Sequence, residues 1–129
     1  MFYPHSVDTG TVLPWEYMKA AAGTYKAGQL LDATGGQVKP ISAASKTTPG
    51  YLCMGNVTVE DGGLVPVTRI QHTVIYETQL SAAAEGAAEG SKLEVSAGGL
   101  QVDAAAAGTF EVNYLESTEA GATVRGRFI

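Results

Sequence analysis

The residues that most often carry chemistry are few and separated in this sequence. His5 and His72 stand alone, and neither has a second histidine at a metal-ligand spacing. Cys53 lies in the apolar run Tyr51-Leu-Cys-Met54, where burial raises rather than lowers a thiol pKa. A lone histidine on a strand is more often a satisfied residue than a catalyst. These residues predict neither a metal site nor an activated nucleophile.

The acidic and glycine-rich segments also lack a catalytic pattern. Glu60 and Asp61 precede a Gly-Gly turn, and the other acids are scattered, so they form no recognisable acid/base pair. No glycine-rich segment has the Gly-x-x-x-x-Gly-Lys-Ser/Thr form of a phosphate loop. We therefore expect no cofactor and no enzyme activity. A hydrolase is the minor alternative, which assays on ester, peptide and glycoside substrates would reveal.

Size and charge narrow the class of protein. A chain of 129 residues fits one domain, and its net charge of −5 with no Lys/Arg cluster argues against a nucleic-acid partner. Residues 77–119 carry eight acids against one base, Lys92, so part of the surface should be negative. A single cysteine excludes an intramolecular disulfide and fits either a reducing compartment or a site where the redox state does not matter. With neither a membrane-length apolar run nor a signal-peptide pattern at the start, we expect a soluble protein without membrane contact.

Glycine pairs divide the chain into strands. Gly35-Gly36, Gly62-Gly63 and Gly98-Gly99 each separate two runs of β-prone residues, and paired glycines supply the positive φ of tight turns. They predict three β-hairpins. Period-2 alternation predicts further strands at residues 65–70, 74–80, 110–115 and 122–129. Residues 81–90 predict at most one helical turn. For residues 14–23 the alternatives are a helix that begins at Pro14 and ends at Gly23, and a strand over residues 16–21, which we favour. The fold class is therefore all-β.

Two of the predicted hairpins resemble each other. Residues 28–38 and 90–102 share the order Gly, Leu, Gly-Gly, Val, and residues 21–25 and 106–110 both read Ala-Ala-Gly-Thr followed by an aromatic residue. Either the hairpin unit is repeated, or the likeness is chance similarity in a chain rich in Gly and Ala.

The first residues differ from the rest. Pro4, Gly10 and Pro14 suppress regular structure, yet the segment is rich in apolar side chains. We interpret residues 1–15 as an extended N-terminal arm that orders on a partner, followed by a β domain over residues 16–129. The alternative is a terminus that is disordered or folded back on its own domain. The expected anchors on the partner are Phe2, Tyr3, Val7, Val12, Leu13 and Trp15.

The order and spacing of the glycine turns and strands resemble a known family. The segments Thr24-Tyr-Lys-Ala-Gly-Gln-Leu-Leu31, Gly35-Gly-Gln-Val38-Lys-Pro, Thr48-Pro-Gly-Tyr-Leu-Cys-Met54, Gly63-Leu-Val-Pro-Val-Thr-Arg-Ile70 and Ala120-Gly-Ala-Thr-Val-Arg-Gly-Arg-Phe128 resemble the small decoration, or cement, proteins on the heads of tailed bacteriophages. The likeness covers most of residues 20–128.

The resemblance implies a fold, partners and a location. It implies a small β-barrel or β-tulip that sits on the outer capsid surface of the virion, after synthesis in the host cytoplasm. It also implies that the protein clamps adjacent subunits of the major capsid protein, often through an N-terminal arm and as a homo-oligomer, with a trimer favoured. The alternatives are a phage fibre or receptor- or glycan-binding β module, and an appendage subunit that polymerises with itself.

Overall fold

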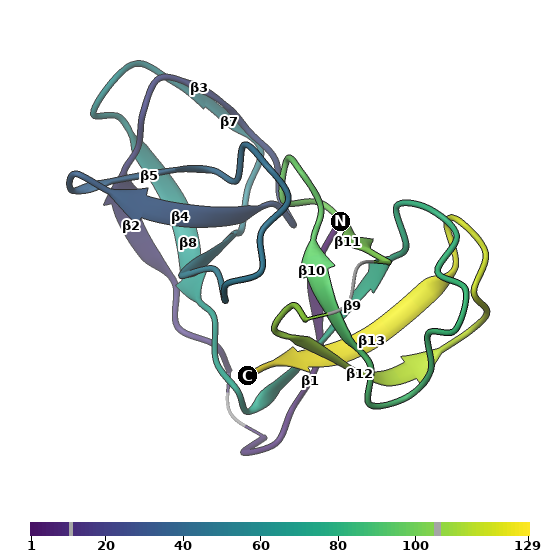
Figure 1. Ribbon diagram of the computed structural model, residues 1–129. Helices are drawn as coiled ribbons and strands as arrows, with labels where there is room; N and C mark the ends of the chain where they lie inside the picture. Colours follow the sequence, from purple (N-terminus) through teal and green to yellow (C-terminus); the bar gives the residue numbers. More distant parts are fainter. Residues whose placement is uncertain (11, 105–106) are drawn as a thin grey trace.

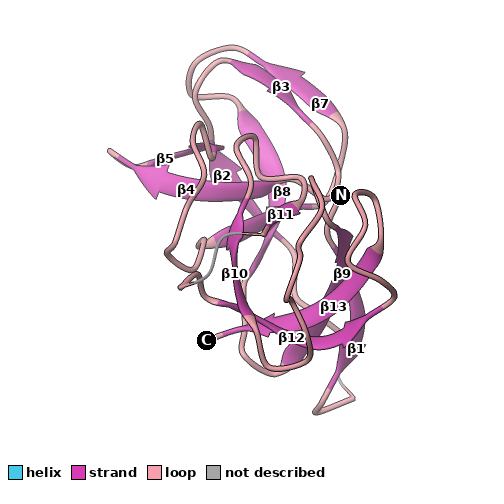
Figure 2. Ribbon diagram, turned by 45° about the vertical axis from the view of Figure 1, so that its right-hand side comes forward, coloured by secondary structure: helices cyan, strands magenta, loops and turns pink. Residues whose placement is uncertain are grey.

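The computed structural model describes residues 1–10, 12–104 and 107–129. In this part of the chain there are thirteen strands and no helix (Figure 2), which confirms the all-β class. The strands form a six-stranded sheet, a five-stranded sheet and a two-stranded ribbon. Among the described residues no strand ladder closes either large sheet on itself, so the fold is sandwich-like, and the expectation of a barrel is wrong.

The five-stranded sheet belongs to the first half of the chain. Its order is β2-β8-β6-β4-β5, with bounds Glu16–Lys19 (β2), Leu64–Arg69 (β8), Tyr51–Cys53 (β6), Leu30–Thr34 (β4) and Gln37–Pro40 (β5). The ribbon of β3 (Gly23–Tyr25) and β7 (Val57–Val59) covers one face, at the top of Figures 1 and 2. Between them lies a small core of Ala20, Tyr25, Leu31, Val38, Cys53, Val65 and Val67.

The six-stranded sheet holds the second half of the chain and the N-terminus. Its order is β1-β9-β13-β12-β10-β11, with bounds Tyr3–Val7 (β1), Val74–Gln79 (β9), Thr123–Phe128 (β13), Phe110–Leu115 (β12), Lys92–Val95 (β10) and Val102–Asp103 (β11). The main core lies between this sheet and the first half, because Leu30, Ile41 and Leu52 join the buried residues of the second half. In β13 the alternation is as predicted, with Val124, Gly126 and Phe128 buried.

Two of the three predicted hairpins form. Gly35-Gly36 joins β4 to β5, and Gly98-Gly99 lies in the loop between β10 and β11. The hairpin predicted at Gly62-Gly63 is wrong, because β7 pairs with β3 whereas β8 pairs with β2 and β6. The glycine pair instead closes a turn in which the Gly63 N–H donates to the Glu60 carbonyl. Residues 81–90 contain turns but no helical turn. β2, at Glu16–Lys19, confirms the strand predicted at residues 16–21.

The two halves have the same topology, and we call the half with β2, β4, β5, β6 and β8 the first repeat and the half with β9 to β13 the second repeat. If the ribbon strands and β1 are set aside, each half has five strands, and in each the strand order is first, fifth, fourth, second, third. The same isolated parallel bridge joins the end of the first strand to the third strand, at Ala20 and Val38 in one half and at Leu80 and Val102 in the other. Figure 1 shows the halves as two lobes.

The register is repeated as well. The cross-strand pairs of β2 and β8 correspond one by one to those of β9 and β13: Glu16–Val67 to Tyr76–Gly126, Tyr17–Pro66 to Glu77–Arg125, Met18–Val65 to Thr78–Val124 and Lys19–Leu64 to Gln79–Thr123. The closing turns match too, since Ala20 exchanges hydrogen bonds with Gly62 and Gly63 as Leu80 does with Gly121 and Ala122.

The structure thus supports the repeated hairpin over chance similarity. The hairpin of β4 and β5 is equivalent to that of β10 and β11, and the N–H of Gly28 donates to Cys53 as that of Gly90 does to Val112. The second likeness, between residues 21–25 and 106–110, lies partly outside the described residues. Its first member leads into β4, whereas its second leads into β12, so the two segments are not equivalent in the repeat.

The N-terminal segment folds back onto its own chain. β1 pairs antiparallel with β9, and the ring of Phe2 is 1% exposed among Tyr76, Phe110 and Phe128. The ring centroids of Phe2 and Phe110 are 5.8 Å apart at 80°, and those of Phe2 and Phe128 are 6.0 Å apart. The predicted extended arm is therefore wrong for residues 2–7, because burying this ring in the core removes it from water without a partner.

This packing predicts that Phe2 stabilises the fold. Phe2→Ala should lower the free energy of unfolding by about 3–5 kcal/mol, the usual cost of truncating a core phenylalanine. Tyr3→Ala is the matched control, because Tyr3 is 46% exposed and its loss should cost little. Denaturant unfolding of the variants measures the difference. Equal stability of Phe2→Ala and the parent protein would show that the segment does not pack as described.

Two buried threonines give a second test. Thr68 Oγ1 is buried without a hydrogen-bond partner among the described residues, whereas Thr78 Oγ1 donates to the Leu100 carbonyl at 3.2 Å. Thr68→Val should raise the free energy of unfolding by about 1 kcal/mol, because it removes an unsatisfied hydroxyl at nearly constant shape. Thr78→Val should lower it by about 1 kcal/mol, because it leaves the carbonyl unpaired. Shifts of the same sign in thermal unfolding would contradict this assignment.

Candidate interaction surface

The structure separates the six predicted anchors instead of grouping them on one arm. Phe2 is in the core, and Val7 and Leu13 are partly buried against it. Tyr3, Val12 and Trp15 are exposed, but Tyr3 lies on β1 beside the second repeat, whereas Trp15 precedes β2 of the first repeat. The boundary drawn at residue 15 therefore does not separate an arm from a domain.

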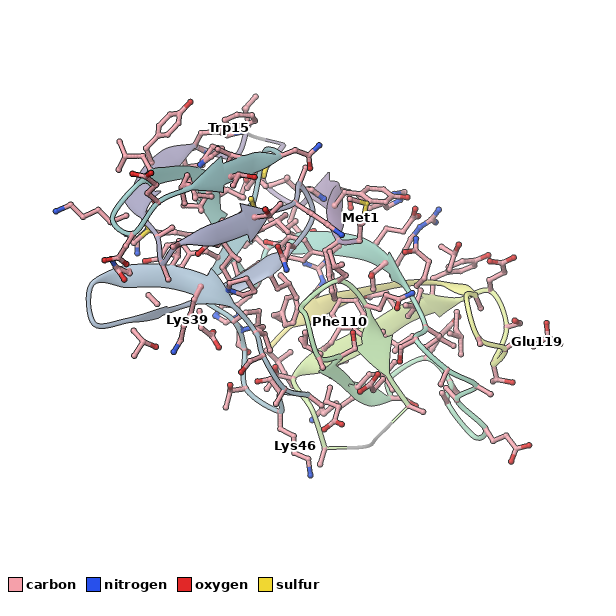
Figure 3. All side chains as sticks on the ribbon, turned by 90° about the horizontal axis from the view of Figure 1, so that it is seen from above. Met1, Trp15, Lys39, Lys46, Phe110 and Glu119 are labelled. Carbon is pink, nitrogen blue, oxygen red and sulfur yellow. The ribbon has the colours of Figure 1, made fainter. Side chains whose placement is uncertain are left out.

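The exposed apolar side chains at β2 form a patch. Trp15, Tyr17 and Leu64 are 56%, 66% and 55% exposed. Tyr17 pairs with Pro66 across the β2–β8 ladder and Lys19 pairs with Leu64, so these side chains share one face, while Met18 points to the small core. Figure 3 shows Trp15 at the periphery, far from Glu119 of the second repeat. We refer to Trp15, Tyr17 and Leu64 as the β2 patch.

Sequence reasoning found Trp15 but missed Tyr17 and Leu64. The alternation of Trp15, Tyr17 and Lys19 with Glu16 and Met18 was the available signal, since it puts two aromatic rings on the face that does not carry the methionine. Leu64 could not be found in this way, because the wrong hairpin at Gly62-Gly63 placed β8 beside β7 rather than beside β2.

The backbone edge of β2 beside this patch is open. Ala20 bonds to Gly62 and Gly63 on the β8 side, while the Ala21 N–H donates to Val38 on the opposite side. Backbone groups alternate along an antiparallel strand, so the N–H and C=O of Tyr17 and the N–H of Lys19 also point away from β8. Among the described residues no strand pairs with this edge at residues 16–19.

Ion pairs fix the surroundings of both first strands. Arg69 Nε donates to Glu16 Oε2 at 2.8 Å on β2, and this hydrogen bond raises the pKa of Arg69. In the second repeat Arg125 Nε donates to the nearly buried Glu77 of β9 at 2.7 Å. Arg127 holds Asp8 at 2.8 Å, and this hydrogen bond lowers the pKa of the Asp8 carboxyl. The first two pairs each join two adjacent strands, and the third joins β13 to the segment that follows β1.

The residues singled out for chemistry are occupied by structural contacts. His72 Nδ1 lies 3.0 Å from the Phe128 carbonyl oxygen, and His5 lies 4.0 Å from Glu77. In the described part of the chain no three His, Cys, Asp or Glu side chains gather as a potential metal site. A mostly apolar pocket of ≈ 280 Å³ lies beside the N-terminus, lined by residues that include Tyr3, Ala27 and Met54.

Comparisons with known proteins add no relative. The sequence matches no protein-family model and no curated protein. No helix of the described residues is long and apolar enough to cross a membrane.

The environment of Cys53 predicts an unreactive thiol. Its side chain is fully buried, and burial raises the pKa of the thiol. Because the thiolate is the reactive form, a water-soluble maleimide at pH 8 should leave the folded protein unlabelled and modify it fully in denaturant. Mass spectrometry measures the added mass. Rapid labelling of the folded protein would contradict the burial of this side chain.

Proposed function

We propose that this protein is a non-enzymatic component of a virion that binds the outside of an assembled capsid and stabilises contacts between major capsid subunits. The observation that supports the proposal most directly is the β2 patch, which leaves a tryptophan, a tyrosine and a leucine in water on one face of a small domain. Trp and Tyr are enriched among residues that dominate protein interfaces. The resemblance to decoration proteins supports the choice of a capsid as partner.

The proposed capsid-binding surface lies on the folded domain and not on an extended arm. Phe2 stabilises the domain from inside, so the residues offered to the capsid are Trp15, Tyr17 and Leu64. Val12, three residues before Trp15, is 93% exposed. Tyr17 and Leu64 lie on the adjacent strands β2 and β8, and Trp15 directly precedes β2. A rigid sheet edge presents them with little loss of conformational entropy on binding, which favours a flat protein surface over a flexible loop-mediated contact.

Many weak contacts suffice for such a role. A decoration protein is present in many copies, and binding across neighbouring subunits gains from effective concentration without requiring a deep pocket. The second repeat carries exposed acids, and Figure 3 shows one of them, Glu119, on the side of the molecule away from Trp15 of the β2 patch. We therefore place the second repeat outward, with the β2 patch towards the capsid.

Co-sedimentation with heads that lack the protein tests the proposal. The parent protein should pellet with such heads, and the double variant Trp15→Ala/Tyr17→Ala should lose about thirty-fold or more in affinity, since a truncated interface aromatic commonly costs about 2 kcal/mol. The control Tyr114→Ala removes a tyrosine that is 42% exposed on the second repeat and should bind normally. Failure of the parent protein to bind heads would overturn the function, and normal binding by the double variant would overturn the site.

A further inference from the structure

Comparison of the two repeats indicates that the open edge of β2 can accept an antiparallel strand. β9 is the equivalent of β2, and its outer edge is covered by β1, with Tyr3 opposite Glu77 and Pro4 opposite Tyr76. The corresponding edge of β2, at Glu16 and Tyr17, has no strand beside it in the described part of the chain. One repeat thus carries an added antiparallel strand at a position that the other leaves vacant.

We propose that β2 pairs antiparallel with β2 of a second copy of this chain, about a two-fold axis at Tyr17. The outward backbone groups belong to the odd-numbered residues, so odd residues must face odd residues across the axis. Centring on Tyr17 places its N–H and C=O opposite those of Tyr17 of the second copy, which forms two hydrogen bonds. It also brings the N–H of each Lys19 to the segment at Trp15.

The side chains select this register over its neighbours. With the axis at Tyr17, Trp15 lies beside Lys19 of the second copy and Glu16 beside Met18, so no like charges meet, and the tryptophan face receives a cation. An axis at Glu16 would put two glutamates directly opposite each other. An axis at Met18 would carry Trp15 to Ala21, where Val38 of β5 already occupies the edge.

The length of the open edge fits this pairing. In the second repeat β1 pairs with β9 as far as Glu77, and the amine of Met1 donates to the side-chain Oε1 of Gln79, the residue before the bridge at Leu80. Gln79 corresponds to Lys19, so a strand on β2 has the same room and ends at the bridge at Ala20. Residues 15–19 of a second copy fill that length.

This contact extends the proposed function, and it is independent of any capsid. It joins two five-stranded sheets through their β2 edges and sets two copies of the β2 patch on one continuous face. A face with two copies of the β2 patch suits binding across the boundary between two adjacent major capsid subunits. The dimer contact is tested on the purified protein alone. A monomeric protein would therefore not argue against capsid binding, and a protein that does not bind heads would not argue against the dimer contact.

Sedimentation velocity from about 1 µM to 1 mM measures the pairing. The parent protein should form a dimer, and Tyr17→Pro should raise the dissociation constant about five- to hundred-fold, because it removes one interchain N–H in each copy. Proline is tolerated on this edge, since the Tyr17 N–H points away from β8. Circular dichroism verifies that the variant is folded.

A pair of charge variants supplies a test that does not depend on proline. Trp15→Lys sets an ammonium group opposite Lys19 of the second copy and should weaken the dimer about two- to thirty-fold, counting two symmetric pairs. Trp15→Glu faces the same lysine and should bind more tightly than Trp15→Lys, with a difference that shrinks as salt rises. A parent protein that stays monomeric up to 1 mM, or an oligomer that neither Tyr17→Pro nor Trp15→Lys weakens, overturns the proposal.

Discussion

The packing of the Phe2 ring is the contact on which the arrangement of this molecule depends. Phe2 touches Phe110 and Phe128 of the second repeat, and its backbone N–H donates to the Gly28 carbonyl of the first at 2.8 Å. A Cβ at Gly28 would lie 2.7 Å from the Phe2 carbonyl oxygen, so only glycine permits this approach. One residue near the terminus therefore joins both repeats and holds β1 against β9.

The internal repeat explains why a chain with few large side chains has two cores. The two halves have the same strand register but different side chains at equivalent positions. Tyr51 pairs with Arg69 in the first repeat, where the second repeat pairs Phe110 with Phe128. The first pair stays partly in water as a cation–π contact at 5.5 Å, while the second forms the centre of the aromatic cluster. The second repeat thus supplies most of the shared core, and the first keeps polar groups at the same positions.

The sequence predicts local features better than long-range ones. Alternation found β8, β9, β12 and β13, and Gly35-Gly36 specified a hairpin, because both signals depend on neighbouring residues only. The pairing of β7 with β3 and the burial of Phe2 depend on contacts between segments that are distant in the chain, which no local pattern encodes. For the candidate surface, Trp15 was found because it adjoins the apolar, proline-broken first segment, which is a local feature, whereas Leu64 required the correct strand order.

The difference between the two repeats lies at their first strands. Both β2 and β9 have one edge taken by the last strand of their repeat, and among the described residues only β9 has a further strand, β1, along its other edge. An uncovered strand edge normally carries charged residues or proline, which prevent association with other strands. In β2 and its approach, Pro14 precedes and Lys19 follows the exposed aromatic residues Trp15 and Tyr17. Because Lys19 meets Trp15 rather than another lysine in the two-fold register, the charge that discourages unrelated strands also favours a second copy. The same short segment can therefore be protected against general aggregation and still be specific for one partner.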